Sequence, residues 1–130
     1  MKLLLRVEDI MHTGDGIPSV LAGVKLRDGL LEMSQKGLGM TAIIDDDEHI
    51  LGIFTDGDLR RALDTGIDVH ATPMDAVMHR GCITIRPDDL AAHAVHILDE
   101  HKITGLLVAD EAGRLVGALN IHDLFRSGVM

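Results

Sequence analysis

Apolar residues recur along the chain in two stretches that share one order of patterns. Each stretch begins with apolar positions at helical spacing. Two short apolar runs follow, separated by acidic turn residues, and this arrangement predicts a β-hairpin. A second helix is predicted directly after each hairpin. These segments are residues 26–33, 41–44, 50–54 and 56–63 in the first stretch, and 90–98, 106–109, 115–119 and 121–126 in the second.

The two stretches are copies of one another. Residues 38–45 align with residues 103–110 at an offset of 65, and a lead-in at residues 8–12 matches residues 75–79 at an offset of 67. A single register over so many positions indicates an internal duplication. The offset of 65 also places Gly52, Asp58 and Arg61 over Gly117, Asp123 and Arg126.

A short strand is expected before the first helix of each copy, around Ile17 and at residues 83–85, which completes a β-α-β-β-α unit. The fold class is therefore α/β (α+β), with repeats at residues 7–66 and 67–130 after a connector at residues 1–6. A unit of about 60 residues is marginally stable alone. We therefore expect the two repeats to pack about a pseudo-twofold axis, leaving two equivalent clefts between them.

Composition limits the classes of partner. The chain has 130 residues, 46% of them hydrophobic, and a net charge of −9, which disfavours nucleic acid and anionic membranes as partners. Cys82 is the only cysteine, so an internal disulfide is excluded and a reducing, cytoplasmic location is expected. The apolar run at residues 3–5 is too short for a signal sequence or a membrane span.

One motif carries candidate chemistry, and it occurs twice as Gly-x-x-(Thr or Asn)-x-x-Asp. Thr55 and Asp58 form it in the first copy, and Asn120 and Asp123 form it in the second. The pairs are typical of helix caps, which alone would explain them. The same groups could also bind a nucleotide, because a helix N-terminus attracts phosphate and a carboxylate accepts hydrogen bonds from a ribose diol.

The paired β-α-β-β-α units resemble a tandem CBS-domain pair, also called a Bateman module. More narrowly, residues 9–15, 52–62 and 119–129 resemble the C-terminal region of bacterial arabinose-5-phosphate isomerases, which serve synthesis of the lipopolysaccharide sugar Kdo. Their chemistry resides in an upstream sugar-isomerase domain for which this chain has no room. The resemblance thus implies a regulatory or oligomerising module without catalytic residues.

The resemblance also implies a set of ligand contacts and partners. The expected ligand is an adenine nucleotide or CMP-Kdo acting as an effector, with no required cofactor, and a homodimer is expected within a homo-oligomeric parent enzyme. A purely structural dimerisation module with empty clefts is the alternative. The expected contacts are the side chains of Thr55, Asp58, Asn120 and Asp123, with backbone at Ile17, Met40, Thr41, Thr84, Ile85, Gly105 and Leu106.

Three other features have simpler explanations. His93, His96 and Glu100 could bind a divalent metal, but an exposed helix face gives the same pattern. The acidic run at residues 45–48 lacks the glycine and terminal glutamate of a calcium loop and predicts a solvated turn. Cys82 has no neighbour in sequence that would clearly activate its thiol, so a buried or inert cysteine is expected.

Overall fold

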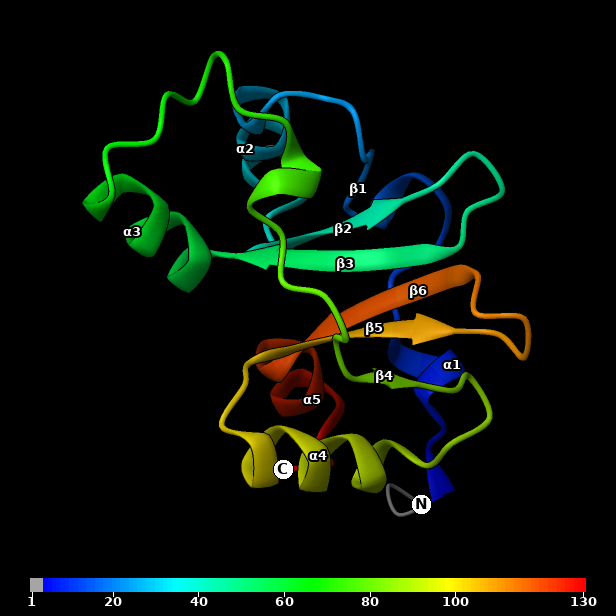
Figure 1. The fold of residues 1–130 in the computed structure, drawn as a ribbon. Coiled ribbons are helices and arrows are strands. Elements are labelled where there is room, and N and C mark those ends of the chain that lie inside the picture. Colours follow the sequence, from blue (N-terminus) through cyan, green and yellow to red (C-terminus); the bar gives the residue numbers. More distant parts are fainter. Residues whose placement is uncertain (1–3) are drawn as a thin grey trace. The chain divides into compact units, whose positions relative to one another are not determined.

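Two three-stranded sheets organise the chain in the computed structural model, which describes residues 4–130 (Figure 1). Residues 1–3, part of the expected connector, lie outside the described residues. In each sheet the middle strand pairs in parallel with the first and antiparallel with the third. One sheet contains β1 (Ser19–Leu21), β2 (Met40–Ile44) and β3 (Ile50–Thr55), and the other contains β4 (Thr84–Ile85), β5 (Gly105–Ala109) and β6 (Leu115–Asn120).

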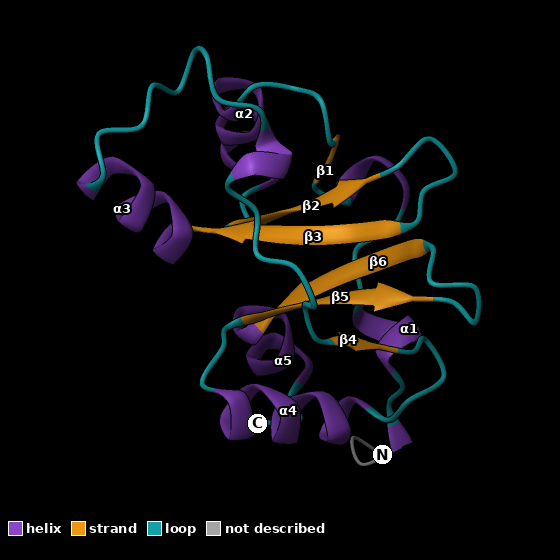
Figure 2. Ribbon diagram, in the orientation of Figure 1, coloured by secondary structure: helices purple, strands orange, loops and turns teal. Residues whose placement is uncertain are grey.

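Helices precede and follow each hairpin, as the sequence predicts (Figure 2). The mixed α/β class and the duplicated order of elements are therefore confirmed. The α-helices are α1 (Val7–Ile10), α2 (Leu26–Lys36), α3 (Asp56–Asp64), α4 (Ala91–His101) and α5 (Ile121–Ser127), with 3-10 helices at Gly14–Gly16 and Met74–Ala76.

The first strand begins later than expected, because Ile17 does not belong to it. The Ile17 amide donates to the Gly14 carbonyl at 3.1 Å, closing the 3-10 turn. Pro18 has no amide hydrogen to offer a strand ladder, although its carbonyl accepts from Ala42. The strand therefore starts at Ser19, which pairs with Ala42.

Strand register repeats along with the sequence. Met40 pairs with Thr55 in one sheet, and Gly105 pairs with Asn120 at the equivalent position of the other. Each hairpin has an irregularity at its far end, between Ile43 and Ile44 or, 65 residues later, between Val108 and Ala109. The repeated register places both candidate motifs at the end of a hairpin, where its second strand continues directly into a helix.

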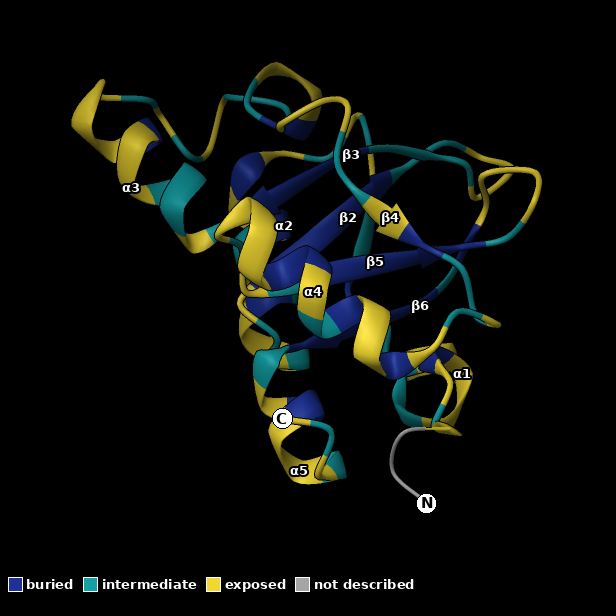
Figure 3. Ribbon diagram, turned by 90° about the horizontal axis from the view of Figure 1, so that it is seen from below, coloured by how far each residue is buried: buried dark blue, intermediate teal, exposed yellow. Residues whose placement is uncertain are grey.

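Each sheet packs one face against its helices to form a core. The strands β2, β3, β5 and β6 are largely buried, whereas each long helix has exposed turns (Figure 3). Strand alternation directs every second side chain of the hairpin into that core. The core beside the first sheet contains Leu26, Met33, Ile43, Phe54, Met74 and Met78. The core beside the second contains Val7, Ile85, Ala91, Ala94, Ile97, Leu98, Leu106, Val108, Leu119 and Leu124.

The compact units differ from the sequence repeats in the lead-in that each contains. One unit is Pro18–Cys82, and the other joins Ile83–Met130 to the segment that ends at Ile17. Backbone hydrogen bonds between Ile53 and His79 attach the second repeat's lead-in to β3. Those between His12 and Ala118 attach the first repeat's lead-in to β6. Each sheet is thus completed by the lead-in that the sequence assigns to the other copy.

Side-chain size matches this exchange. Gly29 of α2 lies so close to Met74 that a Cβ on the glycine would clash with the Met74 sulfur. The corresponding residues of the other unit are Val7 and Ala94, both fully buried in its core. The large Met74 side chain, directly before the second lead-in, thus accompanies glycine, and the smaller Val7, directly before the first, accompanies alanine. With the lead-ins unexchanged, Met74 would meet alanine and Val7 would meet glycine, giving overpacking in one core and a void in the other.

Candidate functional site

The first candidate pair lies where β3 becomes α3. Thr55 is the N-cap, and its hydroxyl accepts from the Asp58 amide at 3.3 Å. In return, Asp58 Oδ2 accepts from the Thr55 amide at 2.9 Å and from the Thr55 hydroxyl at 3.1 Å. This reciprocal capping box satisfies two of the amides that a helix start leaves unpaired. The capping interpretation of this pair is therefore correct, whatever else the pair does.

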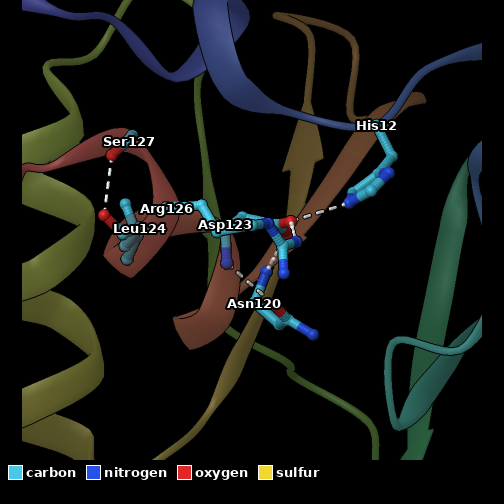
Figure 4. A network of polar contacts seen from close by, with 6 residues as sticks. All are labelled: His12, Asn120, Asp123, Leu124, Arg126 and Ser127. Carbon is cyan, nitrogen blue, oxygen red and sulfur yellow. Dashed lines mark hydrogen bonds and ion pairs between the residues drawn. The ribbon is translucent and has the colours of Figure 1, made fainter.

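The second pair repeats this geometry where β6 becomes α5 (Figure 4). Asn120 Oδ1 accepts from the Asp123 amide at 3.1 Å, and Asp123 Oδ2 accepts from the Asn120 amide at 2.8 Å. Asn120 replaces the hydroxyl of Thr55 with an amide, so the carboxylate here gains no hydroxyl donor. Both residues of this pair are buried.

An arginine one turn further on binds each carboxylate. Arg61 donates to Asp58 Oδ1 at 2.5 Å, and Arg126 donates to Asp123 Oδ1 at 2.6 Å. Both guanidinium groups remain largely exposed, with 72% and 69% of the side chain accessible. Solvent screens the exposed guanidinium of each i, i+3 pair, so the pairs contribute little to stability although the carboxylates are mostly buried. They do place a cationic, multiply donating group beside each carboxylate, where a phosphate could accept from it.

His12 makes the two sites different. Its Nε2 lies 2.9 Å from Asp123 Oδ1, bringing the first repeat's lead-in to the second repeat's motif (Figure 4). His79 is at the matching position of the other lead-in, but within residues 4–130 the Asp58 carboxylate hydrogen-bonds only with Thr55 and Arg61. His12 is not among the site residues that the repeated motif predicts, although its match with His79 in the repeated lead-in is a usable signal.

The expected backbone contacts divide between the units. Met40 and Thr41 adjoin the Thr55 site because Met40 pairs with Thr55 and Thr41 with Phe54. Gly105 and Leu106 adjoin Asn120 in the same way.

The remaining expected contacts lie further along the strands. Thr84 and Ile85 pair with Leu107 and Val108, the residues that follow Gly105 and Leu106 along β5. The side chains of Ile85 and Leu106 belong to the core beneath the sheet, so only their backbone could meet a ligand. Ile17 is half-buried and lies in the loop before β1.

The candidate metal ligands do not assemble. His96 lies 3.2 Å from Glu100 on the exposed face of α4, and both side chains are more than half exposed. Within residues 4–130, no cluster of three histidine, cysteine, aspartate or glutamate side chains could hold a metal ion. Cys82 is half-buried, and burial raises the pKa of its thiol, which opposes thiolate chemistry at neutral pH.

The acidic hairpin turns are held by their first aspartate. Asp45 Oδ1 accepts from the amides of His49 and Asp47, and Asp110 Oδ1 accepts from those of Arg114 and Ala112. The backbone hydrogen bonds from His49 and Arg114 are the main reason that the pKa of each carboxyl lies below 3.8. A solvated turn is thus the observed structure.

We expect these two carboxylates to give part of the acid sensitivity of folding. Since their pKa is lower in the folded chain, their contribution is present above pH 3.8 and is lost as pH falls through the lowered value. The double variant Asp45→Asn, Asp110→Asn keeps both acceptors without the titration. Its urea midpoint should fall less than that of the wild type between about pH 5 and pH 2.5. Asp46→Asn, an exposed neighbour, is the control, and an unchanged acid limb in the double variant would contradict the assignment.

Comparison with known proteins agrees with this architecture. The family model of the CBS domain matches residues 7–65 and again residues 74–129, so the chain belongs to the CBS domain family. Over 129 residues it is 54% identical to arabinose 5-phosphate isomerase KdsD of Pseudomonas aeruginosa and 53% identical to that of Escherichia coli K12. The match covers 99% of this chain but only 40% and 39% of those proteins.

Solved structures share the fold. The AMP complex of the CBS domain protein PAE2072 from Pyrobaculum aerophilum has a TM-score of 0.82 at 21% identity, covering 92% of this chain and 90% of its own. The CBS domain pair of MJ0100, in complex with 5′-methylthioadenosine and S-adenosyl-L-methionine, has a TM-score of 0.84 at 21% identity, covering 95% and 94%. No helix within residues 4–130 combines the length and apolar character that a membrane span requires.

Proposed function

We propose that this chain is the regulatory CBS pair of an arabinose-5-phosphate isomerase and has no catalytic residues of its own. In this proposal the catalytic sugar-isomerase domain belongs to the longer parent protein, which acts in Kdo and lipopolysaccharide synthesis. Two such enzymes support this proposal, because more than half of the aligned residues are identical over nearly the whole chain. The chain spans about 40% of the length of each enzyme. The repeats at 7–66 and 67–130 are the two CBS motifs.

The proposed ligand is a nucleotide or nucleotide sugar, with AMP or CMP-Kdo as candidates. Thr55 and Asp58 carry this part of the proposal because they join a hydroxyl, a carboxylate and a helix N-terminus in one place. The carboxylate would accept from the ribose hydroxyls, while the helix amides and Arg61 would face phosphate. Solved CBS pairs of the same fold hold AMP or adenosine derivatives. Binding of this ligand would change the activity of the parent enzyme.

Calorimetry with AMP, ATP and CMP-Kdo tests this proposal. Asp58→Asn keeps an acceptor for the Thr55 amide but removes the charge, so its affinity should fall by about tenfold to a hundredfold. Asp64→Asn, an exposed residue at the other end of α3, is the matched control and should bind like the wild type. If the wild type binds none of the three ligands below millimolar concentration, ligand sensing is wrong.

A structural module is the second candidate. It is favoured by the capping boxes, since Asp58 and Asp123 already accept three hydrogen bonds each. Exposed apolar side chains such as Leu63 and Phe125 offer surface for self-association into the expected homodimer. Under this alternative, Asp58→Asn lowers stability but changes no ligand response. The same calorimetry, with a urea titration of each variant, therefore separates the two candidates.

A further inference from the structure

The first lead-in is docked along the unit that contains α5 by a series of backbone hydrogen bonds. The Ala91 amide donates to Leu5, and the Val7 amide donates to Asp89, each at 2.8 Å. At the other end of the segment, His12 exchanges hydrogen bonds with Ala118 of β6 at 2.8 and 3.2 Å. This backbone pairing aims the His12 side chain at the N-terminus of α5. The ring is 37% exposed, whereas the Asp123 side chain that it meets is 6% exposed.

The acceptors of the two carboxylates are used differently. In both sites Oδ2 caps the helix, and Oδ1 is left to interact elsewhere. Asp123 Oδ1 accepts from both Arg126 and His12, which occupies both of its lone pairs. Asp58 Oδ1 accepts from Arg61 alone and retains one lone pair. A ribose diol would therefore find a free acceptor at Asp58, whereas at Asp123 it would have to displace His12 or Arg126.

We infer that Asp123 anchors the lead-in through His12 instead of serving a ligand, so that the chain binds one diol-bearing nucleotide, at Thr55 and Asp58. The anchoring role stands on the contacts of His12 and Asp123 alone. The count of one ligand rests on the proposed function. His12 is a positioning residue in this scheme, since it fixes the segment of residues 5–12 to the start of α5.

The N-cap residue differs between the two sites in a way that fits these two roles of the carboxylates. Thr55 has a hydroxyl that can rotate away from Asp58 and donate to a ligand, whereas Asn120 offers no hydroxyl and is buried. The carboxylate at Asp123 is likewise the less accessible of the two, at 6% against 13% of the side chain. Both differences reduce ligand access at the second motif while leaving its helix cap intact.

A double-mutant cycle tests the anchor without any ligand. His12→Ala, Asp123→Asn and their combination are compared by urea unfolding, with His79→Ala and Asp58→Asn as the matched cycle of the other repeat. The first cycle should be non-additive by about fivefold to tenfold in the unfolding equilibrium constant, and the second should be additive. Additivity in the first cycle overturns the inference. If Asp123→Asn does not fold, faster amide exchange at residues 12 and 118 in His12→Ala supports the anchor, and unchanged exchange overturns it.

Calorimetry with AMP then tests the number of nucleotides bound per chain. One AMP per wild-type chain, weakened by Asp58→Asn and unaffected by Asp123→Asn, supports the inference. Two AMP per chain, or a loss of binding on Asp123→Asn alone, overturns it. If the first cycle is non-additive but AMP does not bind, AMP is rejected as the ligand and Asp123 is still the anchor. Failure of the proposed function is therefore distinguishable from failure of the anchor.

Discussion

A fragment of residues 18–82 should unfold in one cooperative transition, whereas a fragment of residues 7–66 should show none. The first fragment follows the compact unit and the second follows the sequence repeat. Residues 7–66 lack Met74, which is fully buried, and the carbonyls of Thr72 and Val69 that accept from the first amides of α2 at 2.8 and 2.9 Å. The fragment of residues 7–66 thus loses a core side chain and also the hydrogen-bond acceptors of the first amides of α2. Together these losses should prevent a unit of this size from folding.

Urea titration followed by circular dichroism measures this difference. Met74→Asp in the fragment of residues 18–82 is the control, because a charge at a fully buried position should remove the transition. A cooperative transition in the fragment of residues 7–66 would show that the lead-in exchange is dispensable. Equal behaviour of the two fragments would also contradict the expected result.

Gly52→Ala should destabilise the whole chain by about 1–3 kcal/mol. A Cβ at this position would lie 2.8 Å from both the His79 carbonyl oxygen and the Met78 sulfur. The methionine could move, but the carbonyl belongs to backbone that is hydrogen-bonded to Ile53. Relief of the clash therefore requires β3 and the second lead-in to separate.

Two other glycines complete this test. Gly117→Ala should cost less, because its Cβ would meet the flexible Met11 side chain and lie 3.2 Å from the His12 carbonyl. Gly23→Ala should be nearly neutral, since nothing lies within 4 Å of its Cβ. Urea midpoints should decrease in the order Gly23, Gly117, Gly52. Reversal of the last two would mean that the second lead-in is held less tightly than the first.

Most of the local structure could be predicted from the sequence. Both hairpins, both following helices and both capping pairs occur where the pattern places them, because each depends on residues a few positions apart. The first strand begins two residues later than the pattern predicts, because the Ile17 amide closes a 3-10 turn and Pro18 has no amide hydrogen for the ladder. His12 was missed because its partner is 111 residues away in the chain.

The sequence by itself determined that the chain is a duplicated β-α-β-β-α unit with a capped helix after each hairpin, since periodicity and caps are short-range properties. Only the tertiary structure decided which lead-in completes which sheet. The lead-ins share one pattern, so local preferences cannot distinguish the two arrangements, and the choice depends on matched volumes such as Met74 beside Gly29. The same long-range packing places His12 beside Asp123 and leaves Asp58 with an open acceptor, a difference between two sites that share one sequence motif.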